Sequence, residues 1–223
     1  MIAPVACVIP ALDAARTLGG VIAALRAAVP HAALIVVDDG SRDDTFAIAC
    51  ATADVARRLP RNRGKGAALR VGFAEALALD AAAVLSLDAD GQHDAATAPA
   101  LLDALAHADL VVGTRRRHEG MPFGRRVTNV LASAAVGAIV GGVVPDSQSG
   151  FRAMRRVVLE HVHASGDRYE FETDFLIRAA RHGFRLAAVP VRTVYGAPSH
   201  FRAVRDSARV VRIIWHHRAG AFG

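Results

Sequence analysis

The chain has 223 residues, 52% of them hydrophobic, so it is long enough to bury a core and too apolar to be intrinsically disordered. Its 27 basic and 21 acidic residues give a formal net charge of +6, which favours an anionic partner: nucleic acid, a membrane surface or a phosphorylated substrate. Cys7 and Cys50 lie in apolar patterns without metal-site spacing. We expect both to be reduced core residues of a cytosolic protein that carries no secretory signal.

Short apolar runs alternate with helix-like segments along the first half of the sequence. These runs are apolar throughout, which indicates strands of a parallel sheet covered by helices on both faces. No linker rich in Gly, Pro or Ser precedes the second half, so we expect a single domain. The expected strands lie at 5–10, 33–41, 55–60, 82–88, 108–115 and 185–195, and the expected helices at 14–28, 42–53, 63–80, 95–107 and 169–183.

An uncharged run from Val127 to Pro145 has nearly the length of a transmembrane helix. A helix that spans a bilayer needs about 20 predominantly apolar residues. Thr128, Asn129, Ser133 and several glycines dilute this run. We therefore expect a helix that is buried in the protein or lies on a membrane surface.

Three polar clusters follow expected strands at the point where each strand ends. They are DDGS at 38–41, DADGQ at 88–92 and GTR at 113–115. In open α/β sheets, ligands bind outside the carboxyl ends of the parallel strands. The three clusters therefore predict one site on one rim of the sheet.

The stretch LSLDADGQHD at 85–94 ends an apolar run in three acids. The alternate spacing of Asp88, Asp90 and Gln92 can direct their oxygen atoms to one point, and hard oxygen ligands suit Mg²⁺ or Mn²⁺. A solvated turn after a strand is the alternative. We favour a metal site, with His93 as a hydrogen-bonding neighbour.

The glycine turn NRGKGAALR at 62–70 leads into an expected helix. Its glycine spacing fits neither the dinucleotide fingerprint nor the P-loop. Backbone N–H groups at a helix N-terminus beside Lys65 suit a phosphate, although a solvated turn that starts a helix fits equally well. Asp38 and Asp39 also allow a structural and a functional interpretation. They could cap the next helix, or they could accept hydrogen bonds from a base or ribose.

Seven motifs occur in the order found in a known enzyme family. They are VIPALD, VVDDGSRDDT, NRGKGAAL, LDADGQHD, VVGTRRR, DSQSGFRAMRR and YEFETDFLIRAARHGFRLAAVPV. Over residues 4–212 the chain resembles family 2 glycosyltransferases of the GT-A fold, and among them the dolichol- or polyprenyl-phosphate sugar transferases. The resemblance implies an α/β fold with a Rossmann-like, mostly parallel sheet, helices on both faces and a C-terminal amphipathic helix. It implies one domain over 1–223, with a nucleotide-binding half at 1–115 and an acceptor- and membrane-facing half at 116–223.

The resemblance also assigns residues on the donor side of the site. Asp88, Asp90 and Gln92 match the DxD-type element that holds Mg²⁺ or Mn²⁺ against the donor diphosphate. Arg115 matches an arginine that faces phosphate and is expected, with Asp90, to act in catalysis. The residues expected to line the nucleotide pocket are Pro10, Asp38, Asp39, Lys65 and Asp88.

On the acceptor side, the segment GAPSHF at 196–201 corresponds to a loop that closes over the substrates. His200 replaces a lysine of the family there, which puts that phosphate contact in doubt. The first motif of the family continues with Asn-Glu, whereas this chain has Asp13 and Ala14, so a glutamate contact to the nucleotide is missing or is supplied elsewhere. The residues matched to phosphate or acceptor are one of Arg125 and Arg126, together with Ser149, Gly150, Ser199, His200 and Arg202.

The implied reaction is an inverting transfer from a GDP- or UDP-sugar to a polyprenyl phosphate or related membrane lipid. An anionic phosphate acceptor needs no strong base, whereas a hydroxyl acceptor on a glycan, glycolipid or pigment requires a carboxylate. Asp174 is matched to that base, and Glu170 and Glu172 are two other candidates for the role. The alternative is that these acids belong to a solvated helix face and have no catalytic role. A non-catalytic basic module for nucleic acid is disfavoured, because few aromatic residues accompany the basic ones and the acid clusters would repel a polyanion.

The C-terminal stretch from about 200 to 218 predicts an amphipathic helix, with an apolar stripe that ends at Trp215. Such a helix suits an anionic membrane surface. The alternative is a helix that packs on the domain and exposes its basic side to solvent. We expect a cytoplasmic enzyme, peripheral at the inner face of the membrane, with a separate membrane-protein partner. His216 and His217 are expected to be solvated. The basic stripe consists of Arg202, Arg205, Arg209 and Arg212.

Overall fold

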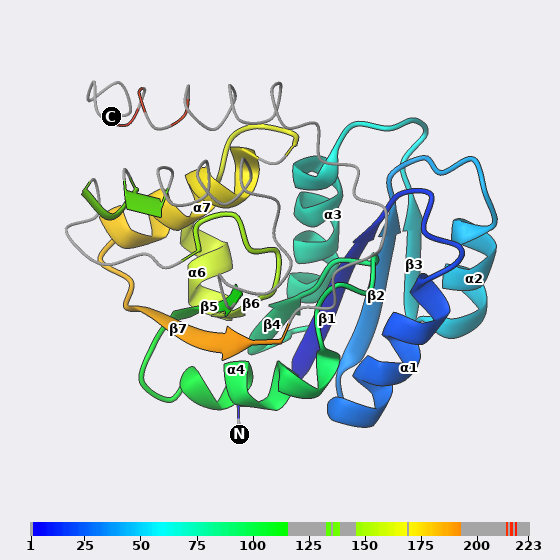
Figure 1. Cartoon of the computed structure of the whole chain (residues 1–223), viewed down its shortest axis with the longest axis horizontal. Coiled ribbons are helices and arrows are strands. Elements are labelled where there is room, and N and C mark those ends of the chain that lie inside the picture. The colour runs from blue at the N-terminus through cyan, green and yellow to red at the C-terminus, as the bar shows by residue number, and fades with distance from the viewer. Residues whose placement is uncertain are drawn as a thin grey trace.

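The computed structural model describes residues 2–115, 133–134, 136–138, 146–168, 170–192, 213, 215 and 217. Within these residues seven strands form one sheet in the order β3-β2-β1-β4-β6-β5-β7 (Figure 1). The strands are β1 Val5–Ala11, β2 Ala33–Asp38, β3 Val55–Arg58, β4 Ala83–Ser86, β5 Leu110–Arg115, β6 Arg152–Arg155 and β7 Leu186–Val191. The helices are α1 Leu18–Ala28, α2 Thr45–Thr52, α3 Lys65–Ala78, the 3₁₀ turn η1 Ala95–Thr97, α4 Ala98–Ala104, α6 Arg156–His161 and α7 Glu170–Arg181.

The sheet is parallel except for one inserted strand. β1 pairs in parallel with both β2 and β4, β2 pairs in parallel with β3, and β5 pairs in parallel with β7. β6 lies antiparallel between β4 and β5, so β4 and β5 run in the same direction. The expected mostly parallel sheet is confirmed, whereas the sequence did not predict β6.

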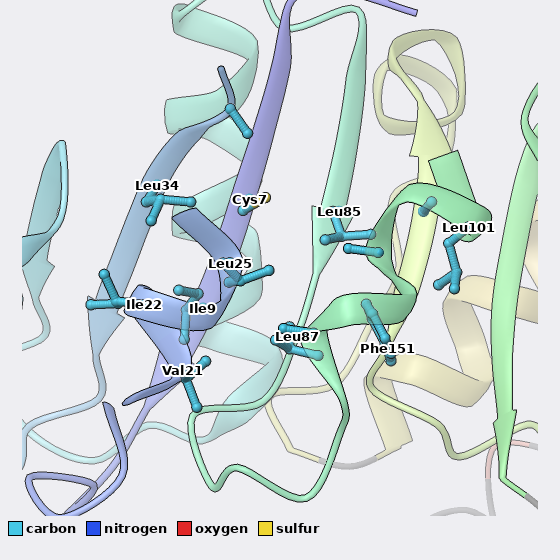
Figure 2. Packing of buried hydrophobic residues seen from close by; sticks show 14 of the residues in the cluster. Cys7, Ile9, Val21, Ile22, Leu25, Leu34, Leu85, Leu87, Leu101 and Phe151 are labelled. Carbon is cyan, nitrogen blue, oxygen red and sulfur yellow. The ribbon is translucent and has the colours of Figure 1, made fainter. Parts of the chain in front are cut away.

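The central strands are apolar on both sides because helices cover both faces of the sheet. Ala6 and Val8 of β1 belong to a core cluster shared with α3, α6 and α7. Cys7 and Ile9, the alternate residues, belong to a second cluster with α1, α2 and α4. Figure 2 shows this second cluster, in which Leu25 of α1 and Leu101 of α4 pack against the strands. The uninterrupted apolar runs of the sequence therefore reflect burial from two sides.

Two details correct the expectations from sequence. Both cysteines are free thiols, but Cys50 is exposed, so the prediction that it is a core residue was wrong. Cys7 is buried, and this burial raises the pKa of its thiol to about 12. The helix expected from residue 14 begins at Leu18, and a turn at residues 15–17 leads into it.

The two segments expected to contact a membrane lie largely outside the described residues. Among the residues that are described, no helix is long and apolar enough to cross a bilayer. In the uncharged run, Ser133 and Val136 are buried. Of the C-terminal stretch only 213, 215 and 217 are described, and the expected amphipathic helix stays a prediction.

Candidate active site

The polar clusters predicted at strand ends share one rim of the sheet. Asp38 is the last residue of β2, and Asp88 follows β4 by two residues. Both strands run parallel to β1, which lies between them. Strands that are two apart in a sheet lie about 10 Å from each other, so the two acidic ends lie on either side of the end of β1. Pro10 lies there too, in register with Val37 of β2.

The loop after β4 holds the acids matched to the metal site. The Gln92 N–H donates to Asp90 Oδ1 at 3.0 Å, and Gly91, with φ of 71°, makes the turn between them. The Thr17 hydroxyl donates to the Ala89 carbonyl at 2.6 Å, which ties this loop to the start of α1. The loop is therefore held from both sides while Asp88 and Asp90 stay partly exposed.

Lys65, the first residue of α3, bridges two carboxylates from distant parts of the chain. Its Nζ lies 2.5 Å from Asp88 Oδ1 and 2.8 Å from Glu172 Oε1. Burial by itself would lower the pKa of Lys65, but the charges of Asp88 and Glu172 outweigh that effect and raise its pKa above the usual value. The lysine is therefore a permanent cation beside the acidic loop.

Asp38 and Asp39 hold the backbone of neighbouring loops. Asp38 accepts hydrogen bonds from the N–H and the hydroxyl of Ser41, and its Oδ2 lies 3.1 Å from Arg58 Nε. Asp39 accepts the N–H groups of Arg63 and Gly64, each at 2.7 Å. Burial raises the pKa of Asp39, although these two N–H donors act in the opposite direction.

The contacts of Asp39 explain how the glycine turn presents Lys65. Gly64 has φ of 111°, and a Cβ at that position would lie 2.4 Å from the carbonyl oxygen of Asp167. Asp39 thus fixes a turn that needs glycine, directly before the helix that begins with Lys65. Beside the turn lies an open hollow lined by Pro60, Arg61, Asn62, Arg63 and Asp167.

The segment 146–150 closes the other side of Lys65. Gly150 packs against the ion pair, since a Cβ added there would lie 2.5 Å from Lys65 Nζ and 2.6 Å from Asp88 Oδ2. The Gly150 carbonyl accepts from the Ser86 hydroxyl at 3.0 Å, which joins this segment to β4. Ser149 is fully buried, and its hydroxyl oxygen accepts from the Phe151 N–H at 3.4 Å.

The buried Arg152, which the sequence did not indicate as a site residue, holds this region together. Arg152 donates to the carbonyls of Ser147, Ser149 and Glu172 at 2.9, 2.8 and 2.7 Å. Burial lowers its pKa, while the charges of Glu172, Asp146 and Asp88 oppose this effect. Arg152 therefore ties the segment 146–150 to the backbone of α7.

Asp174 is fully buried and both of its oxygens are engaged. Oδ2 accepts from the Ser165 N–H at 2.6 Å and from Arg178 Nε at 2.8 Å, and Oδ1 lies 2.6 Å from His217 Nε2. His217 is 2% exposed, so the expectation that it is solvated was wrong. These contacts give Asp174 a structural explanation, as an anchor between α7 and the C-terminal stretch.

The residues of the acidic loop fit a divalent cation. Asp88 and Asp90 supply hard carboxylate oxygens two residues apart, and Asp88 already attracts a cationic group. In the part of the chain that is described, no group of three or more His, Cys, Asp or Glu side chains forms a ready-made metal site. Mg²⁺ commonly binds to one or two carboxylates and completes its shell with substrate phosphates, so the two acids suffice when a diphosphate is bound.

A family model described as glycosyl transferase family 2 matches residues 6–162. The chain belongs to this family. As a family 2 glycosyltransferase, it carries the acidic loop, the glycine turn and the segment 146–150 all within the matched range.

Two curated relatives extend the match toward the C-terminus. Polyprenol monophosphomannose synthase of Mycolicibacterium smegmatis is 34% identical over 198 residues, which cover 82% of this chain and 75% of that protein. Undecaprenyl-phosphate mannosyltransferase of Micrococcus luteus is 32% identical over 202 residues, covering 84% of this chain and 82% of that protein. Both names describe sugar transfer involving a polyprenyl carrier.

A solved structure confirms the expected fold. Glucosyl-3-phosphoglycerate synthase from Mycobacterium tuberculosis, crystallised with Mn²⁺ and UDP-glucose, superposes with a TM-score of 0.78 at 25% identity. The superposition covers 96% of this chain and 78% of that chain. This chain thus shares its α/β fold with an enzyme that was crystallised with a nucleotide sugar and a divalent cation.

Several matched residues are not placed in the site by the structure. Arg115 ends β5, paired in register with Val191, but its side chain lies outside the described residues. The other matched residues outside the described part of the chain are Arg125, Arg126, Ser199, His200 and Arg202.

Gly150→Ala is expected to weaken binding of the nucleoside diphosphate at least about tenfold, a loss of about 1.4 kcal/mol. The added methyl would displace Lys65 Nζ and Asp88 Oδ2, both within 2.6 Å of its position. Calorimetric titration with UDP and GDP in the presence of Mn²⁺ measures the effect. Gly19→Ala is the matched control, since nothing lies within 4 Å of a Cβ at that position. Equal affinities for the two variants would mean that the Lys65–Asp88 pair does not contact the nucleotide.

The folded state is expected to lose stability in acid because His217 is buried against Asp174. Burial lowers the pKa of His217 below its usual value of 6.5. As the pH falls through 6.5, the unfolded chain therefore binds a proton that the folded chain does not bind. The free energy of unfolding then decreases with falling pH, by up to about 1.4 kcal/mol for each pH unit. Thermal unfolding between pH 7.5 and 5.5 should show a smaller loss for His217→Asn than for wild type. An identical pH dependence would contradict a buried neutral His217.

Proposed function

We propose that this family 2 glycosyltransferase transfers a sugar from a nucleoside-diphosphate sugar to a polyprenyl phosphate. The observation that carries the proposal is the charge arrangement on the rim. Lys65 at the N-terminus of α3 pairs with Asp88 of the acidic loop, so a cation held by that loop and a diphosphate bound to the cation would lie beside the lysine. In this assignment residues 1–115 bind the donor, and the segments that follow receive the acceptor.

Each residue of the site has a role in the proposed donor complex. Asp88, Asp90 and the Gln92 amide hold Mg²⁺ or Mn²⁺, which supplies positive charge to the departing diphosphate. Lys65 adds a second positive charge at the same oxygens. Asp39 acts through the glycine turn, whose backbone it fixes.

Two observations support a phosphate as the acceptor. The curated relatives are named for polyprenyl carriers. The carboxylate matched to a general base, Asp174, has both oxygens engaged by Ser165, Arg178 and His217. A phosphate oxygen is already anionic and attacks without a base, so transfer to phosphate is compatible with this arrangement.

A membrane surface belongs to the same proposal. Trp215 is 66% exposed, and an exposed tryptophan near basic residues suits the interface of an anionic bilayer. We propose that the enzyme works peripherally at the cytoplasmic face, with a membrane-protein partner.

Transfer of radiolabelled sugar into the lipid phase tests the proposal. Purified enzyme is mixed with GDP-mannose, UDP-glucose or UDP-N-acetylglucosamine, with Mn²⁺ or EDTA, and with vesicles that contain undecaprenyl phosphate or undecaprenol. We expect one donor to label the phosphate lipid, with Mn²⁺ and not with EDTA, and undecaprenol to remain unlabelled.

Two results would overturn parts of the proposal. Labelling of undecaprenol in preference to its phosphate would favour a hydroxyl acceptor and restore the need for a base. Full activity in EDTA would remove the cation from the mechanism.

A further inference from the structure

Lys65 lies between two carboxylates that belong to different parts of the site. Asp88 is on the acidic loop after β4, whereas Glu172 is in the first turn of α7. The two distances, 2.5 and 2.8 Å, place the ammonium within hydrogen-bond reach of both groups at once. Gly150 lies against the ammonium, since a Cβ added there would lie 2.5 Å from Lys65 Nζ.

Glu172 is built as a fixed acceptor for this lysine. Its side chain is buried, and its backbone carbonyl is held by the Arg152 guanidinium at 2.7 Å. Arg152 is in turn anchored by the carbonyls of Ser147 and Ser149. A carboxylate in the first turn of a helix is also favoured by the helix dipole. The backbone position of Glu172 is thus held by the framework and not by Lys65 alone.

A divalent cation on the acidic loop competes with Lys65 for Asp88. The ammonium and the cation would share the same carboxylate at close range, where like charges repel strongly in a partly buried site. Glu172 offers the ammonium a carboxylate that already lies within 2.8 Å of Nζ when the cation takes Asp88.

We propose that Glu172 is a positioning residue that takes over Lys65 when the cation occupies Asp88. Lys65 then neutralises Asp88 in the cation-free enzyme and pairs with Glu172 in the loaded enzyme. The transfer needs a small movement of the ammonium, because the bond to Glu172 is already formed. It leaves Lys65 beside the position of the donor diphosphate. This inference rests on the metal-dependent transfer proposed above.

Direct Mn²⁺ binding tests the exchange without turnover or acceptor. Bound Mn²⁺ is measured by electron paramagnetic resonance for wild type, Glu172→Gln, Lys65→Met and the double variant, without nucleotide. We expect Glu172→Gln to weaken binding on the order of tenfold, because Lys65 is then retained on Asp88, and Lys65→Met to tighten binding by a similar factor. In the Lys65→Met background the Glu172→Gln change should alter the affinity less than about twofold.

Control variants separate the exchange from other effects. Glu170→Gln removes the same charge two residues earlier on α7, where the side chain accepts from the Arg168 N–H, and should leave Mn²⁺ affinity unchanged. Lys65→Gln keeps a polar donor and replaces Lys65→Met if the latter unfolds, as judged by circular dichroism.

Three outcomes would overturn the inference. Equal weakening by Glu172→Gln in both backgrounds would mean that Glu172 attracts the cation directly. No weakening in the wild-type background would mean that Lys65 does not need Glu172 to leave Asp88. Lys65→Met binding no tighter than wild type would mean that the lysine does not compete at all. Because no acceptor is present, these outcomes are independent of whether polyprenyl phosphate is the substrate.

Discussion

Asp90→Asn is expected to lower the rate of sugar transfer at least about 100-fold, because it removes a negative charge from the group that holds the cation at the leaving diphosphate. The substitution keeps the size of the side chain and its oxygen acceptor for the Gln92 N–H. The loop should therefore fold as in wild type. The initial rate of lipid labelling at saturating donor, with the thermal unfolding temperature beside it, measures the effect.

Asp94→Asn is the matched control for this prediction. Asp94 lies on the same loop, and its Oδ1 accepts the Ala96 N–H at the start of η1, a contact that asparagine can also make. We expect near-normal transfer from this variant. Near-normal rates in both variants would mean that Asp90 does not bind the cation, whereas a similar loss in both would indicate a general effect of charge on the loop.

Arg152→Met is expected to reduce the free energy of unfolding by about 3–5 kcal/mol. The change leaves three buried carbonyl oxygens, those of Ser147, Ser149 and Glu172, without their donor. It also removes a positive charge close to the buried Glu172 carboxylate. Urea denaturation followed by circular dichroism gives the difference.

Arg155→Met on the same strand provides the comparison. Arg155 also donates to backbone carbonyls, those of Leu105 and Ala108, but its side chain is 34% exposed, so water can replace its contacts. We expect a loss of about 1 kcal/mol for this variant. If the two variants lost the same stability, the buried hydrogen bonds of Arg152 would contribute no more to the stability than the partly exposed ones of Arg155. Arg152 would then not be the residue that holds α7 to the segment 146–150.

Local patterns in the sequence were sufficient for much of the fold and for the donor side of the site. Apolar runs broken by helical segments predicted the parallel sheet, because a strand buried on both faces must be apolar at every position. The glycine turn with Lys65 and the acids at Asp88 and Asp90 were also visible, since each is a short motif that ends a strand or starts a helix. Parallel strands then bring these motifs to the same rim.

Contacts between distant segments were decided by the tertiary structure. The polar sequence RAMR at 152–155 does not read as a strand, yet it forms β6, because neighbours on both sides pair with its backbone. Glu172 was recognised as an acid but not as the partner of Lys65. His217 was expected in solvent and is buried against Asp174. Periodicity reports which residues are buried, whereas the identity of a charged partner depends on how separate elements pack, and no local pattern encodes that.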